Sequence, residues 1–91
     1  MKYAEIKNFI NGEFVDSENT RMDVYSPLNG KVISTVPLST ANDLNKAVDA
    51  AWNAFPNWAG QTSKKRSEVL YRYRNIVEKN IKEIASLIHE E

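Results

Sequence analysis

The first 38 residues follow a two-residue hydrophobic period that is typical of short β-strands. Residues 8–10 and 13–15 flank the dipeptide Asn11-Gly12. This dipeptide favours a two-residue hairpin turn, because both turn positions need positive φ angles that asparagine and glycine tolerate best. We therefore predict a first β-hairpin over residues 8–15.

A second hairpin is predicted from the strands 22–25 and 32–36, which flank the turn segment 26–30. The proline of that segment fixes one backbone angle, and its Asn-Gly pair can supply a left-handed residue. β-branched or small residues fill the second strand, and Pro37 is expected to end it. Residues 16–20 are a polar connection between the two hairpins.

Beyond Pro37 the apolar period changes to 3.6 residues, which predicts an amphipathic helix. Thr40 is a good N-cap, and Asp43 three residues later gives a capping box with a short acid. The apolar stripe of this helix contains Ala41, Leu44, Ala47, Val48, Ala51, Trp52 and Phe55. Pro56 is expected to stop the helix, because the residue before a proline is pushed away from helical angles.

Residues 56–62 are expected to form a loop that holds Trp58, and Ser63 is expected to cap the next helix. Apolar residues then recur at helical spacing towards the end of the chain. Because Asn80 is a good N-cap followed by glutamate three residues later, we predict helices over 64–79 and 81–90. The predicted fold class is α+β, with two N-terminal β-hairpins followed by two or three α-helices.

Composition narrows the classes of function. The 91 residues include 12 basic and 12 acidic side chains and no cysteine. A neutral chain has no long-range field to concentrate nucleic acid or anionic lipid, and no apolar stretch is long enough to span a membrane. The N-terminus lacks the apolar core of a secretory signal, so a cytoplasmic location is expected. A chain of this size buries about 60–65% of its unfolded surface, which predicts a modest core.

No residue pattern predicts a catalytic or metal site. His89 has no second histidine or cysteine to converge with, and a zinc site needs three or four ligands. Glu90 and Glu91 diverge by about 100° on a helix, so they cannot form an acid–base pair. The glycines are too far apart for a dinucleotide-binding or phosphate-binding loop: Gly12, Gly30 and Gly60. We therefore expect no catalytic, cofactor-binding or metal-binding residue in the chain.

Two surface patterns leave alternatives open. One is superficially similar to a nucleic-acid surface and contains Lys64, Lys65, Arg66, Tyr71, Arg72, Tyr73 and Arg74. A solvated helix face explains it better, because Glu68 stands four residues before Arg72 and Tyr73 belongs to the apolar stripe. The lysines of the first turn oppose the helix dipole, which a carboxylate on a partner would offset. The other pattern, the aromatic group Trp52, Phe55 and Trp58, favours core or docking surface over a ligand cage.

Ordered motifs along nearly the whole chain carry a family resemblance. The first two are Phe9-Ile10-Asn11-Gly12-Glu13-Phe14 and the run from Val24 to Ile33, which contains Ser26-Pro27-Leu28-Asn29-Gly30. Later matches are Val36-Pro37, Ser39-Thr40-Ala41, Asp43, Ala47-Val48, Ala50-Ala51, Ala54-Phe55-Pro56, Trp58, Arg66, Leu70, Tyr73, Ile84-Ala85, Leu87-Ile88 and Glu91. This order resembles the opening of aldehyde dehydrogenases, in which asparagine is usual at the position of Ser26. Residues 8–17 and 54–59 are most similar to the methylmalonate-semialdehyde branch.

The resemblance implies that residues 1–91 are the N-terminal portion of an NAD-binding domain, an incomplete domain with hairpins over 1–38 and helices over 40–91. In such an enzyme a cysteine attacks the aldehyde, NAD accepts the hydride, and coenzyme A or water takes the acyl group. Those functional residues lie downstream in the family. We therefore expect a non-catalytic fragment that binds no cofactor itself and that scaffolds an oxidoreductase.

The resemblance also implies partners. The apolar helix faces would dock on the remainder of the enzyme, and in its absence they would cause self-association or a domain-swapped dimer. Neither nucleic acid nor membrane is expected as a partner. The alternative is a free-standing α+β protein-interaction module derived from the same fold. The sequence leaves open which aldehyde is used, whether NAD or NADP is preferred, and whether coenzyme A or water is the acyl acceptor.

Overall fold

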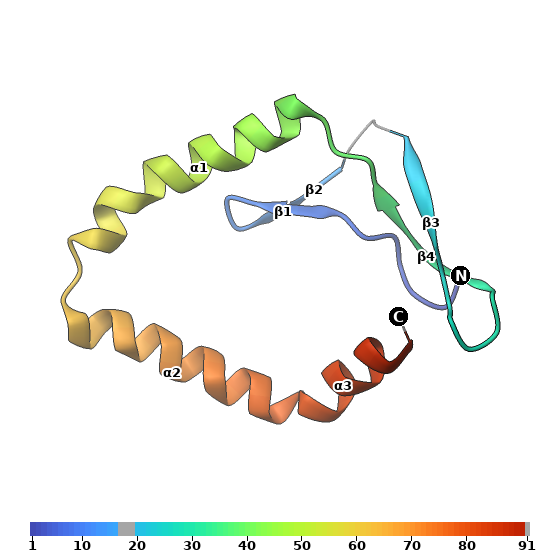
Figure 1. The fold of residues 1–91 in the computed structure, drawn as a ribbon. Helices are drawn as coiled ribbons and strands as arrows, with labels where there is room; N and C mark the ends of the chain where they lie inside the picture. The colour runs from blue at the N-terminus through green and yellow to red at the C-terminus, as the bar shows by residue number, and fades with distance from the viewer. Residues whose placement is uncertain (17–19, 91) are drawn as a thin grey trace. The chain divides into compact units, whose positions relative to one another are not determined.

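A computed structural model describes residues 1–16 and 20–90. In this part of the chain four strands precede three helices (Figure 1). The elements are β1 (Asn8–Ile10), β2 (Glu13–Val15), β3 (Arg21–Tyr25), β4 (Val32–Pro37), α1 (Ala41–Ala59), α2 (Ser63–Lys79) and α3 (Ile81–Glu90). The chain divides into two compact units, Met1–Asn53 and Ala54–Glu91, with the boundary inside α1. The predicted α+β class, two hairpins followed by helices, is confirmed. Residues 17–19 of the predicted polar connection and Glu91 lie outside the described residues.

The first hairpin forms at the predicted Asn-Gly turn. Both turn residues are left-handed, with φ of 54° at Asn11 and 78° at Gly12, as the tight turn requires. β1 and β2 pair in antiparallel register with Phe9 opposite Phe14, and the two rings lie 5.0 Å apart between centroids. A cross-strand aromatic pair of this kind adds packing energy to an otherwise small sheet.

The second hairpin pairs β3 with β4 in antiparallel register, from Arg21 opposite Pro37 to Tyr25 opposite Val32. Its strands extend slightly beyond the predicted ranges, and Pro37 is the last residue of β4, as predicted. A register shift between Val24 and Tyr25 adjusts the ladder before the turn. Both hairpins are two-stranded, so their stability depends on what packs against them.

Ser26 closes the turn between β3 and β4 and is buried. Its N–H donates to the Lys31 carbonyl, and its carbonyl accepts from the Gly30 N–H, both at 2.8 Å. The Ser26 hydroxyl accepts from the Leu28 N–H at 3.2 Å. A serine hydroxyl can thus make the local side-chain turn bond that asparagine makes more strongly. Serine is therefore compatible with this turn.

The N-terminal segment lies along the free side of β4, which the sequence pattern does not predict. The Tyr3 N–H donates to the Ile33 carbonyl and the Ile6 N–H to the Thr35 carbonyl, each at 2.9 Å. Ile33 and Ser34 are buried beneath this cover. The small core of the unit Met1–Asn53 therefore sits at β4, where backbone partners lie on both sides.

The start of α1 is confirmed but its end is not. Thr40 and Asp43 form the predicted capping box. The helix then continues through Pro56 to Ala59, so the prediction that Pro56 stops it is wrong. A proline removes its own N–H bond and crowds the carbonyl four residues earlier, but only three residues of the helix follow it here, so the loss is small enough to be tolerated. The helix ends at Ala59, and the N–H of the following Gly60 donates to the Pro56 carbonyl at 3.0 Å. Trp58 therefore lies on a helix and not in a loop.

The start of α2 is one residue earlier than predicted. Thr62, in extended conformation, is the N-cap, and its hydroxyl accepts from the Lys65 N–H at 3.2 Å. Ser63, the predicted cap, is instead the first helical residue. Thr62 has the same hydroxyl chemistry as serine, so spacing alone could not decide between the two neighbours.

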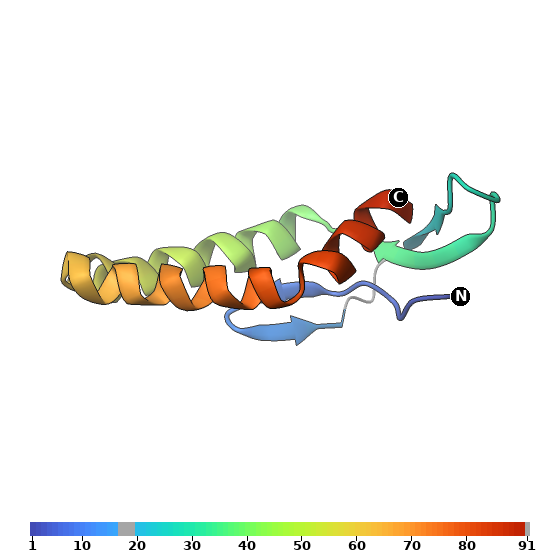
Figure 2. The same ribbon diagram turned by 90° about the horizontal axis from the view of Figure 1, so that it is seen from below.

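The predicted break at Asn80 is confirmed, with α3 starting at Ile81. The Asn80 N–H donates to the carbonyls of Ile76 and Val77, and its side-chain amide donates to the Ile76 carbonyl at 2.8 Å. The amide therefore closes the end of α2, whereas the sequence pattern had suggested a cap for α3. Figures 1 and 2 both show α3 leaving the direction of α2 at this point.

Candidate functional site

Candidate metal-ligating side chains do not gather in one place in residues 1–16 and 20–90. No three acidic, histidine or cysteine side chains gather there in a way that could hold a metal ion. His89 lies in the last turn of α3, and Glu90 follows it. Gly12 and Gly30 occupy hairpin turns, and Gly60 follows α1, so none of them builds the loop that a dinucleotide phosphate needs.

One carboxylate in the described part of the first unit has a clearly perturbed titration. The Lys7 ammonium lies 2.7 Å from an Asp16 carboxylate oxygen. Its hydrogen bond and then its charge lower the pKa of Asp16 from the ordinary value, with a smaller contribution from Arg21. Asp16 is fully exposed, so this pair is an ordinary surface ion pair and not a tuned catalytic group.

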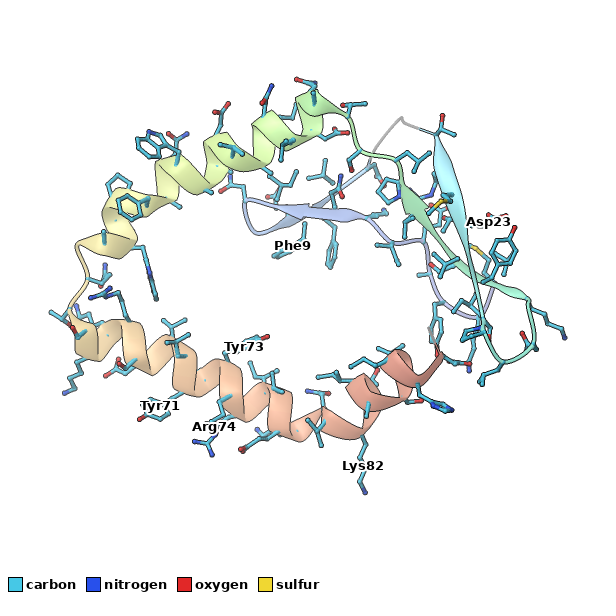
Figure 3. The ribbon with its side chains drawn as sticks, viewed as in Figure 1. Phe9, Asp23, Tyr71, Tyr73, Arg74 and Lys82 are labelled. Atoms are coloured by element: carbon cyan, nitrogen blue, oxygen red, sulfur yellow. The ribbon has the colours of Figure 1, made fainter. Side chains whose placement is uncertain are left out.

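The basic and aromatic residues of α2 divide between two sides of the helix. Tyr71 and Arg74 point to one side and Tyr73 to the other (Figure 3). Arg74 donates to Glu78, one turn later, at 3.1 Å. This division supports the interpretation of a solvated face beside an apolar stripe, because one continuous basic and aromatic surface is not formed. The expected pairing of Glu68 with Arg72 stays a prediction.

The main surface feature is apolar. Trp52 is 75% exposed on α1, Tyr73 is 67% exposed on α2, and Ile88 is 71% exposed on α3. No residue of the three helices is buried. Large apolar side chains that gather on the surface of a soluble protein mark an interaction surface. The candidate functional site of this chain is therefore a set of docking faces.

An open groove of about 500 Å³ lies within the unit Ala54–Glu91, where α1 meets α2. Trp58 lines it together with Lys65, Glu68 and Arg72. Both signs of charge are present beside the indole, so the groove is not selective for an anion such as phosphate. The groove places Trp58 of the predicted aromatic group on a recessed surface and not in a closed ligand cage.

Among the described residues, no helix is long and apolar enough to cross a bilayer.

Sequence reasoning missed the position of one residue of α2. Arg66, named above only within the basic run and the family motif, is half-buried near the start of α2. The available signal was its helical neighbourhood, which contains no acidic residue three or four positions away.

Comparison with known sequences identifies the class to which this fold and these docking faces belong. Residues 14–91 match the aldehyde dehydrogenase family, so the chain belongs to that family. Among individual relatives, it is 44% identical over 84 residues to malonate-semialdehyde dehydrogenase 2 of Bacillus cereus, covering 91% of this chain and 17% of that protein.

Two further relatives have related names. Malonate-semialdehyde dehydrogenase of Pseudomonas aeruginosa is 42% identical over 86 residues, which cover 94% of this chain and 17% of that protein. The mitochondrial acylating methylmalonate-semialdehyde/malonate-semialdehyde dehydrogenase of Mus musculus is 39% identical over 84 residues, 91% of this chain and 16% of that protein. The chain thus spans about one sixth of the length of the curated relatives it matches.

Proposed function

We propose that this chain is the non-catalytic N-terminal scaffold of an NAD-dependent aldehyde dehydrogenase. The observation that carries the proposal is the exposure of its helices: apolar positions recur at helical spacing, yet no residue of α1, α2 or α3 is buried. An amphipathic helix normally buries its apolar stripe against another element. The remaining part of a longer enzyme is the surface that these stripes fit.

The substrate of the whole enzyme is proposed to be methylmalonate or malonate semialdehyde. The names of the Bacillus, Pseudomonas and mouse relatives support this class of aldehyde. The mouse relative is named as acylating, which supports coenzyme A as the acyl acceptor in preference to water.

The residues that carry out the chemistry are proposed to lie outside this chain. The sequence has no cysteine, so the nucleophile that the family resemblance implies comes from outside residues 1–91. NAD, when bound elsewhere in the enzyme, supplies the hydride acceptor. The residues of this chain hold the shape of the domain around that chemistry, and the isolated chain is inactive.

The activity is tested on the product of the genomic reading frame that carries residues 1–91. We expect NADH formation from methylmalonate or malonate semialdehyde that depends on coenzyme A and yields the corresponding acyl-CoA. Turnover without thioester formation would contradict the acylating route while leaving the family intact. A reading frame that stops after Glu91 would favour the free-standing interaction module.

The scaffold role is tested by expressing residues 1–91 and the rest of the reading frame as two separate chains. We expect the two chains to copurify and activity to need both, because each covers apolar surface of the other. The control is the 91-residue chain alone with all substrates, for which we expect no turnover. Activity of the remainder without residues 1–91 would contradict the scaffold role.

A further inference from the structure

Arg66 contains a polar atom that is cut off from water without a partner. Its Nε has no hydrogen-bond acceptor within the described part of the chain, although it is screened from solvent. A guanidinium N–H that loses water and gains no acceptor is destabilising, because the bonds it made to water are not replaced. The surroundings of Arg66 are therefore incomplete in this chain.

Helical neighbours cannot supply the missing acceptor. The residues three and four positions from Arg66 are Thr62, Ser63, Val69 and Leu70, none of which has a carboxylate. Elsewhere on α2 the opposite holds. Arg74 has Glu78 one turn later and bonds to it at 3.1 Å, on the solvent side of the helix. Local ion pairing therefore satisfies the exposed arginine and leaves the half-buried one without a partner.

Arg66 also lies on the apolar side of α2. At 100° per residue, Leu70, Tyr73 and Val77 fall within about 40° of its direction on the helix. We call these four residues the Arg66 seam. Tyr73 points away from the side that holds Tyr71 and Arg74 (Figure 3). Leu70 and Tyr73 are exposed and Val77 is half-buried, so the seam has an apolar face with one unpaired cation at its end.

We propose that the Arg66 seam docks against a segment of the remaining enzyme that places a carboxylate on the Arg66 guanidinium, with Nε as donor. This inference rests on the proposed function, and it adds the chemistry of the partner. A carboxylate matches the planar donor fork of arginine and makes a short, charge-assisted hydrogen bond. The apolar residues of the seam would exclude water from that bond, which strengthens it.

Charge complementarity argues against a second copy as the occupant. A symmetric contact between two seams would bring together only Arg66, Leu70, Tyr73 and Val77 of each chain. None of these side chains can accept a charge-assisted bond from arginine as a carboxylate does. Both guanidinium groups would stay unpaired in such a dimer. The partner must therefore differ from the seam itself.

The test uses the full reading-frame product. Arg66→Met keeps the length and apolar stem of the side chain but removes the guanidinium. We expect it to lower the folded-to-unfolded ratio at a fixed urea concentration by about 30-fold or more, since it leaves a desolvated carboxylate unpaired. Arg66→Lys should lower this ratio less, because lysine keeps the positive charge but lacks the planar set of N–H donors of the guanidinium. The matched control Lys64→Met, on an exposed lysine two residues before Arg66 that does not line the groove, should change the ratio by less than about 2-fold.

The direction of the stability change in Arg66→Met decides whether an acceptor reaches Arg66 Nε in the whole enzyme. If no acceptor reaches Nε in the whole enzyme, removing the guanidinium relieves a cost, and the variant is at least as stable as the wild type. That result would overturn the inference. If Arg66→Met cannot be recovered folded, the intermediate stability of Arg66→Lys supplies the comparison.

A crystal structure of the whole enzyme gives an independent readout. We expect a carboxylate oxygen about 3 Å from Arg66 Nε. A backbone carbonyl or a water molecule there would overturn the assignment of a carboxylate. A wild-type product without aldehyde dehydrogenase activity would instead refute the proposed function. An active enzyme with a neutral Arg66→Met variant refutes only the inference about the seam.

Discussion

The backbone N–H of Thr40 donates to the Asp43 carboxylate at 2.8 Å, and the Asp43 N–H donates back to the Thr40 hydroxyl at 3.3 Å. Each residue thus satisfies a backbone donor of the other at the start of α1. This reciprocal pair fixes the point at which the strand-rich part of the chain becomes helical, because the first helical N–H groups have no partners within the helix.

Thr40→Ala should therefore weaken the start of α1. Loss of an N-cap hydroxyl costs about 1 kcal/mol. We expect faster amide hydrogen exchange at Leu44, whose N–H donates to the Thr40 carbonyl in the first turn. Thr40→Ser keeps the hydroxyl and serves as the control. Equal exchange rates in wild type and Thr40→Ala would contradict the importance of the cap.

Gly12→Ala should destabilise the first hairpin through backbone strain alone. The φ of Gly12 is +78°, and a Cβ added there would meet no heavy atom within 4 Å. A left-handed alanine costs about 1–2 kcal/mol. NMR should show weaker cross-strand contacts between Phe9 and Phe14. Gly12→Asn, which tolerates the left-handed region better, should recover part of the loss; equal effects of alanine and asparagine would argue against strain as the cause.

Pro56→Ala should strengthen the last turns of α1. It restores a backbone N–H and removes a ring that crowds the carbonyl four residues earlier, which costs about 3 kcal/mol in a helix interior. Because Pro56 stands close to the helix end, we expect a smaller gain, seen as higher helicity in far-UV circular dichroism. Asn57→Ala, at the next position, tests whether the introduction of an alanine by itself raises the helicity. Unchanged helicity in Pro56→Ala would show that other contacts hold this turn.

The Lys7–Asp16 pair predicts a pH effect of defined sign. Because Lys7 lowers the pKa of Asp16 in the folded chain, the pair favours the folded state above the unfolded pKa of aspartate, about 3.9. That contribution disappears as the pH falls through the folded pKa. Lys7→Met should raise the pKa of Asp16, measured by NMR titration of its carboxyl carbon, whereas Lys46→Met should leave it unchanged. An unchanged pKa of Asp16 in Lys7→Met would show that the ion pair does not form in solution.

The isolated chain should self-associate through its uncovered apolar helix faces. Ile88 on α3 is 71% exposed, and such side chains gain by leaving water together. Sedimentation velocity should show a larger species as the concentration rises. Ile88→Glu should shift the distribution towards monomer, whereas Ser86→Glu, an equal charge change at an exposed polar position, should shift it less. A compact wild-type monomer at high concentration would refute this prediction.

Local patterns predicted most elements because each depends on neighbouring residues. Asn11-Gly12 located the first turn, the Thr40–Asp43 pair located the start of α1, and Asn80 located the break between α2 and α3. The errors came where two local solutions compete. Thr62 and Ser63 both carry a hydroxyl that can cap a helix, and α1 continues for one turn beyond Pro56.

The sequence by itself determined the order of hairpins and helices, the absence of a cysteine nucleophile and the family resemblance, because these depend on residue identity and short spacing. Tertiary structure alone decided that the segment from Tyr3 to Ile6 covers β4 and that Arg66 Nε is shut away from water without an acceptor in the described residues. Both results depend on which atoms exclude solvent. That property arises from three-dimensional packing, and no spacing along the chain specifies it.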